Sequence, residues 1–93
     1  MDIGRVGVWT RTDGFSTAEA VEFAQRVEEL GYGTLWIPDA FGRDPFAHAA
    51  LLFANTQRLN IATGVVNIHL REAQATRCAQ LELHEQSGGR FLL

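Results

Sequence analysis

Ninety-three residues make one small domain at most. The net charge of −3 gives no electrostatic reason to expect a nucleic acid or an anionic membrane surface as a partner, and the hydrophobic fraction of 46% allows a core. The single cysteine excludes an internal disulfide framework. Without a long apolar run or a secretory leader, the chain is expected to be cytoplasmic, with no membrane span.

The first thirty residues predict a strand followed by an amphipathic helix. Arg5–Trp9 is a short strand, and Asp13-Gly14 marks the turn after it. Ser16 and Glu19 have the spacing of a capping box, which satisfies two amide donors at a helix start. Gly31 ends the helix, because glycine enters the left-handed region freely. The apolar face of this helix carries Ala20, Phe23, Ala24, Val27 and Leu30.

A second strand and helix follow. Thr34–Ile37 does not alternate between apolar and polar residues, which is typical of a parallel strand covered on both faces. Pro38-Asp39 stops this strand. Asp44-Pro45 then begins a helix, with a capping carboxylate and a proline at the first helical position, and the helix continues to about Asn55.

The third unit is centred on Leu59–Arg71, which reads LNIATGVVNIHLR. It begins as a buried strand, but Gly64 within the strand pattern indicates a bulge or a close approach to the backbone. A helix is expected from Glu72 to about Gln86, closed by Ser87–Gly89, and Arg90–Leu93 begins a fourth strand. The residues expected to face inward on this helix are Ala75, Cys78, Ala79 and either Leu81 or Leu83.

The strand starts lie 25 to 31 residues apart, which predicts three right-handed strand–helix–strand crossovers and a parallel α/β sheet. The turn after the first strand, TRTDGFS, has one glycine and is a poor match to the dinucleotide-binding fingerprint of a Rossmann fold. We therefore expect the N-terminal part of an eight-stranded (β/α)8 TIM barrel, a fold of about 250 residues. Residues 1–93 would be one truncated domain, whose exposed strand edges could pair with another chain to form a homo-oligomer.

Several segments together resemble the luciferase-like monooxygenase superfamily, and within it the oxidoreductases that use the deazaflavin coenzyme F420. They are RVGVWT at Arg5–Thr10, ELGYGTLWIPDAFGRDPF at Glu29–Phe46, LNIATGVVNI at Leu59–Ile68 and SGGRFLL at Ser87–Leu93.

The resemblance implies a (β/α) barrel with the cofactor ring at the carboxyl ends of the strands. It implies that Gly64 and Val65 form a bulge, often with a non-prolyl cis peptide, that backs one face of the ring. It also places Asp39 near the reacting carbon, whereas Ala40 departs from the histidine that often follows this acid. The loops that bind the phosphate-bearing tail in such relatives come from later strands, so this chain would form at most one wall of the site.

The candidate catalytic residue is Asp39, either as a buried carboxyl with a raised pKa or as a turn residue that caps loop amides. Gly64 and Val65 are candidates to brace the ring, the alternative being an ordinary glycine at a strand end. Asn67 would either bond the polar edge of the ring or satisfy bulged backbone groups. Trp9 is a candidate to line the cavity.

Other polar residues have simpler expected roles. Arg71 could meet a phosphate or carboxylate, but a solvated arginine at the helix entry is favoured. His48 is expected to pack in its helix, and His69 to lie in a surface loop. His84 has no second ligand at metal spacing, so no metal site is expected. Cys78 would be a small apolar filler.

The function that these features favour is an oxidoreductase that transfers a hydride between coenzyme F420 and a small organic substrate. The alternative within the same superfamily is a monooxygenase dependent on flavin mononucleotide (FMN). A third reading, of another class, is a non-catalytic barrel piece that only associates with another chain. The 93 residues alone are expected to be inactive.

Overall fold

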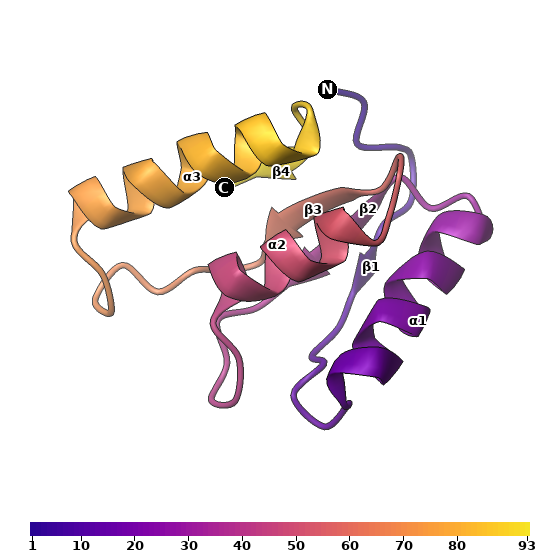
Figure 1. Ribbon diagram of the computed structural model, residues 1–93, viewed down its shortest axis with the longest axis horizontal. Coiled ribbons are helices and arrows are strands. Elements are labelled where there is room, and N and C mark those ends of the chain that lie inside the picture. Colours follow the sequence, from indigo (N-terminus) through magenta and orange to yellow (C-terminus); the bar gives the residue numbers. More distant parts are fainter.

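The structure is a computed structural model that describes residues 1–93, and it contains three strand–helix units followed by a fourth strand (Figure 1). All neighbouring strands are parallel, and their order in the sheet is β1-β2-β3-β4. This order never reverses, so the sheet lacks the switch point of a doubly wound fold. The elements are β1 (Val8–Trp9), α1 (Thr17–Glu29), β2 (Thr34–Ile37), α2 (Pro45–Ala54), β3 (Asn60–Thr63), α3 (Ala73–Ser87) and β4 (Phe91–Leu92).

The strand register brings three loops to one edge of the sheet. Trp9 pairs with Trp36, and Ile37 pairs with Thr63, so β1, β2 and β3 finish at similar heights. The loops that follow these strands therefore meet at the carboxyl edge. In barrel enzymes this is the edge that carries the active site.

One hydrophobic core lies between the helices and the sheet. Leu35, Ile37 and Ile61 from the strands are fully or almost fully buried, and they pack with Leu52 and Phe53 of α2. Burying a side chain of this size contributes about 1.5–3 kcal/mol to folding. The core cluster comprises Ala24, Val27, Leu35, Ile37, Phe46, Ala49, Leu52, Phe53, Leu59, Ile61, Leu83 and Phe91.

The helix ends confirm the signals in the sequence. The Ser16 side chain accepts from the Glu19 amide while the Glu19 carboxylate accepts from the Ser16 amide, which completes the capping box. Asp44 caps α2 through the Ala47 amide, with Pro45 at the first helical position. Gly31 follows α1 with a φ of 88°, in the left-handed region that favours glycine.

Two expectations about element details are wrong. The edge strands β1 and β4 are shorter than predicted, because each has only one neighbour to pair with. The inward face of α3 was predicted correctly only in part: Leu83 is buried and Ala79 packs on the core, as expected, whereas Ala75, Cys78 and Leu81 are exposed, so Cys78 is not an apolar filler. The observed stripe follows helical spacing through Thr76, Ala79, Leu83 and Ser87.

None of the helices combines the length and the apolar character that a membrane-spanning segment requires.

Candidate active site

Gly64 lies where β3 ends, against two tryptophans. The Trp9 indole nitrogen donates a 2.6 Å hydrogen bond to the Gly64 carbonyl oxygen. A Cβ at Gly64 would lie 3.3 Å from Trp9 Cδ1, so the Trp9 ring would have to shift by a few tenths of an ångström, and 3.5 Å from Trp36 Cε3, an ordinary contact. The Gly64–Val65 peptide bond is cis, as the resemblance implied. The close approach that the glycine predicted is therefore confirmed, and the group that approaches is the indole of Trp9.

The segment after Gly64 stays attached to the end of β2. The Gly64 amide donates to the Ile37 carbonyl at 2.8 Å, and the Asp39 amide donates to the Val65 carbonyl at 3.0 Å. The Val65 side chain is left 76% exposed, and Trp9 is 57% exposed. Residues 63–67 thus bend beside Asp39, as expected, and present apolar side chains to the space outside the carboxyl edge.

The Asp39 carboxylate is a buried acceptor in an ion pair. Its Oδ2 accepts from the Arg71 guanidinium at 2.8 Å and from the Asn67 amide at 3.1 Å, and its side chain is 5% exposed. The Arg71 hydrogen bond lowers the pKa of Asp39, with help from the Asn67 amide, and outweighs the opposing effect of burial. Of the two roles expected for Asp39, the carboxyl with a raised pKa is wrong and the cap of a loop amide is present, so Asp39 is ionised at neutral pH.

Arg71 bridges two carboxylates of the β2–α2 loop. Its second arm donates to Asp44 Oδ1 at 2.6 Å, and its guanidinium lies 4.8 Å from the centroid of the Phe46 ring. The Asp39 hydrogen bond raises the pKa of Arg71 further. The expectation of a solvated arginine is wrong: the side chain is 17% exposed, and it meets carboxylates. A sequence signal existed, because two acids flank the neighbouring loop on the same edge of the sheet.

Asn67 satisfies the backbone of its own loop. Its Oδ1 accepts from the His69 amide at 2.9 Å, and its carbonyl accepts from the Leu70 amide at 3.2 Å. Of the two roles expected for Asn67, the structure contains the backbone role, and His69 is an exposed loop residue, as expected. The Asn67 side-chain nitrogen has no partner in the chain, so it is available as a donor.

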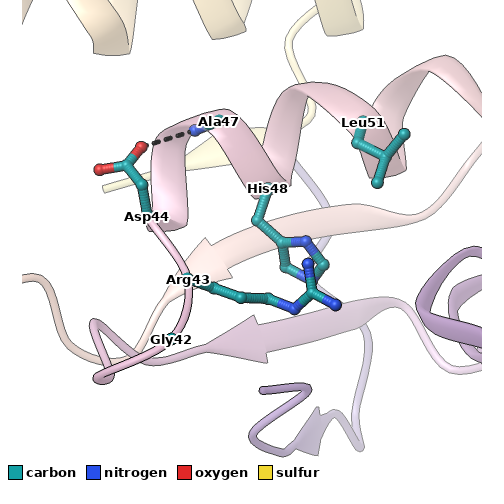
Figure 2. A pocket seen from close by; sticks show the side chains of 6 residues that line it. All are labelled: Gly42, Arg43, Asp44, Ala47, His48 and Leu51. Carbon is teal, nitrogen blue, oxygen red and sulfur yellow. Dashed lines mark hydrogen bonds between the residues drawn. The ribbon is translucent and has the colours of Figure 1, made fainter. Parts of the chain in front are cut away.

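A cavity of about 240 Å³ lies beside the start of α2, lined by Gly42, Arg43, Asp44, Ala47, His48 and Leu51 (Figure 2). In Figure 2 the Arg43 and His48 side chains extend to one side of the helix start, and the Asp44 carboxylate turns to the Ala47 amide. Arg43 donates to the carbonyls of Thr12 and Phe15 at 3.0 and 2.6 Å, which fastens the β2–α2 loop to the β1–α1 loop.

His48 lies behind this cavity and shares a 2.8 Å hydrogen bond between Nε2 and the buried Thr12 hydroxyl. Its Nδ1 is buried and has no hydrogen-bond partner in the protein. The ring is packed as expected, but only one of its two nitrogens is hydrogen-bonded. Burial lowers the pKa of His48, and the nearby Arg43 charge lowers it further, so the ring is neutral. The sequence carried no signal for the Thr12 contact, which joins residues 36 positions apart.

Known proteins share both the sequence pattern and the fold of this chain. The sequence profile of the luciferase-like monooxygenase domain matches residues 1–93. The chain belongs to the luciferase-like monooxygenase family. Its four parallel strands form the N-terminal part of the TIM-barrel fold of these enzymes.

Two relatives are named as a reductase and as an F420-dependent oxidoreductase. The chain is 35% identical over 72 residues to the 5,10-methylenetetrahydromethanopterin reductase of Methanolobus tindarius, a match that covers 76% of this chain and 22% of that protein. It is 32% identical over 89 residues to Rv3520c of Mycobacterium tuberculosis, named as a coenzyme F420-dependent oxidoreductase, covering 96% of this chain and 25% of that protein. The chain thus spans about a quarter of the length of these relatives.

Two solved structures share the fold. The coenzyme F420-dependent tetrahydromethanopterin reductase from Methanopyrus kandleri superposes with a TM-score of 0.84 at 20% identity, over 92% of this chain and 25% of that one. The monooxygenase RslO1 from Streptomyces bottropensis gives a TM-score of 0.77 at 18% identity, over 92% of this chain and 31% of that one.

Proposed function

We propose that this chain forms the N-terminal wall of an F420-dependent oxidoreductase barrel. Its reaction would be hydride transfer between the deazaflavin and a small organic substrate. The observation that carries the proposal is the pairing of Gly64 with Trp9 at the carboxyl edge, which leaves Val65 and Trp9 exposed beside a buried, ionised Asp39. Exposed apolar side chains next to a polar anchor fit a planar heterocycle with a polar rim. The relative Rv3520c, named as a coenzyme F420-dependent oxidoreductase, supports the choice of ring.

Each candidate residue has a role in this proposal. The bound deazaflavin would supply the carbon that accepts or donates the hydride. Gly64 and Val65 would brace one face of the ring, and Trp9 would line the cavity. Asn67 would donate to the polar rim through its side-chain nitrogen, because its oxygen already accepts from the His69 amide. Asp39 would be the nearest proton-handling group and only an acceptor at neutral pH, because its pKa is lowered.

The decisive experiment uses a chimera in which residues 1–93 replace the matching quarter of Rv3520c. We expect the chimera to bind F420, and Gly64→Val to abolish binding, because the added side chain displaces Trp9 and occupies the surface proposed to face the ring. Gly14→Val is the matched control, since a Cβ at Gly14 meets nothing within 4 Å. Wild-type F420 affinity in the Gly64→Val chimera would defeat the bracing role.

The FMN-dependent alternative rests on the family profile, which describes monooxygenases. A spectral titration of the chimera with F420 and with FMN separates the two, and preferential binding of FMN would favour the monooxygenase. The same titration of the 93-residue chain alone is expected to give no tight binding of either ring, because later strands supply the loops for the phosphate-bearing tail in such enzymes. Tight binding by the chain alone would contradict the one-wall proposal. The cytoplasmic location stays a prediction.

A further inference from the structure

The segment between β3 and α3 combines exposed apolar side chains with a fixed backbone. Val65, Ile68 and Leu70 are exposed, and the segment contains no helix or strand. Yet Asp39 holds it in three ways: its amide donates to the Val65 carbonyl, and its carboxylate accepts from the Asn67 amide and from Arg71. An exposed loop tied at three points to one neighbouring residue is held in shape rather than free to collapse.

Arg71 closes this arrangement from the far end of the segment. Its two guanidinium nitrogens each take a different carboxylate, Asp39 at 2.8 Å and Asp44 at 2.6 Å. Asp44 also caps α2, so the bridge ties the start of α3 to the start of α2. The planar fork of arginine can make two bonds in fixed directions, which a lysine ammonium cannot reproduce. The Phe46 ring beneath the guanidinium restricts it further.

We propose that Arg71 is a positioning residue for the ring site, which acts through Asp39 to hold Val65 and Asn67 in place. This inference rests on the proposed function and extends it to a residue that acts through its contacts with Asp39 and Asp44. The proposal predicts that substitution of Arg71 weakens F420 binding no more than substitution of Asp39 does, because both changes free the segment between β3 and α3.

A double-mutant cycle in the chimera tests the coupling. Arg71→Gln and Asp39→Asn are each expected to weaken F420 binding about tenfold, and the double variant is also expected to weaken it about tenfold, because partners in one network are not additive. Arg71→Lys should recover only part of the affinity. The control is Arg77→Gln, which removes an exposed arginine on α3. A double variant weakened about a hundredfold, the product of independent effects, would overturn the proposal.

A pH profile of F420 binding gives a readout that a purely structural role would not move. In the unsubstituted chimera Asp39 stays ionised to below its ordinary value of 3.8. Without Arg71 that carboxyl loses its main stabilising contact, so the acid limb of the binding profile should move to higher pH. In Asp39→Asn and in the double variant this limb should be absent. An acid limb in Arg71→Gln at the wild-type position would contradict action through Asp39.

Amide hydrogen exchange in the 93-residue chain separates this inference from the proposed function. We expect the Asn67 amide to exchange at least about tenfold faster in Arg71→Gln than in Arg77→Gln, because its acceptor is no longer fixed. If the unsubstituted chimera binds no F420, the proposed function fails and exchange alone decides whether Arg71 holds the segment. Unchanged Asn67 exchange in Arg71→Gln would overturn the positioning role with or without cofactor binding.

Discussion

The loops at the two ends of the parallel sheet differ in how their side chains are used. At the amino end, polar groups of the connecting loops are bonded within the chain. Glu28, at the end of α1, accepts from the backbone amides of Gln57, Arg58 and Leu59 at 2.6 to 3.3 Å. One carboxylate thus supplies the acceptors for the whole turn that leads into β3.

Arg90 does the same for carbonyl groups at this end. Its guanidinium donates to the carbonyls of Phe53, Thr56, Leu59 and Ser87 and to the Thr56 hydroxyl, and it lies 5.0 Å from the centroid of the Phe53 ring. This explains the SGGRF segment: the arginine reaches back across the sheet end to the carbonyls left after α2. The short strand β4 begins directly after it.

The carboxyl end is different, since its polar contacts hold a segment whose own apolar side chains stay exposed; the amino end also exposes Val6, Leu30 and Tyr32, but none of these belongs to the turns that Glu28 and Arg90 bond. Trp9, Phe41, Val65 and Ile68 are all exposed there. In barrel enzymes the carboxyl end carries function and the amino end carries stability. The comparison therefore predicts that substitutions at the amino end lower the free energy of unfolding, while those at the carboxyl end alter binding.

Among the polar contacts, the largest expected loss of stability comes from Arg90→Met. This change keeps the apolar stem but removes the donors to the carbonyls of Phe53, Thr56 and Leu59, so the free energy of unfolding should fall by about 3 kcal/mol. Urea unfolding measures it, with Arg77→Met as the exposed control. A loss of stability no greater than that of Arg77→Met would contradict the claim that contacts at the amino end of the sheet stabilise the fold.

A smaller loss in the free energy of unfolding, about 1.5 kcal/mol, is expected for Glu28→Gln. The loss is smaller because Glu28 is partly exposed and because glutamine keeps one acceptor oxygen. Burial opposes ionisation of Glu28, but the amides of Arg58, Leu59 and Gln57 outweigh it, so its pKa is lowered from 4.5. A lowered folded-state pKa adds stability above the unfolded pKa. That stability is lost as the pH falls through the folded value.

The stability difference between wild type and Glu28→Gln should therefore be constant above about pH 5 and shrink as the pH falls below 4.5. Unfolding curves recorded from pH 7 to pH 3 test this sign. A difference that grows on acidification would mean that the carboxylate is not the stabilising form.

Much of the fold could be predicted because its signals are local. The capping box at Ser16, the Asp44-Pro45 helix start and the uniform burial of Thr34–Ile37 depend on residues a few positions apart. Gly64 was also found by a local signal, since a glycine in a strand pattern marks a close approach. On α3, Ala79 and Leu83 were predicted inward correctly, but Ala75 and Cys78 were placed there wrongly, because small apolar residues occur on more than one face of this helix.

The sequence offered two acids near the end of β2 as partners for Arg71, but it did not show that both would be bonded, nor which carbonyls the half-buried Arg90 would contact. Arg71 and Asp39 are 32 positions apart, and Arg90 meets carbonyls up to 37 positions away. Every residue has a backbone carbonyl, so the sequence does not indicate which carbonyls a guanidinium will contact. The charge state of Asp39 followed from the same missing contact: burial alone predicts a raised pKa, and the arginine reverses it.

The smallest expected effect on stability is at Phe41, in the β2–α2 loop at the carboxyl edge. Its side chain is 103% exposed, while the Gly42 amide beside it is fixed to Asp13 at 2.7 Å. The loop is thus held without help from the ring, and Phe41→Ser should change the free energy of unfolding by less than about 0.5 kcal/mol. Phe46, in the first turn of α2, has a buried ring and serves as the comparison. Phe46→Ser should lower the free energy of unfolding by several kcal/mol. A large loss of stability in Phe41→Ser would show that the exposed apolar edge is itself part of the folded core, and the division between the two ends of the sheet would then fail.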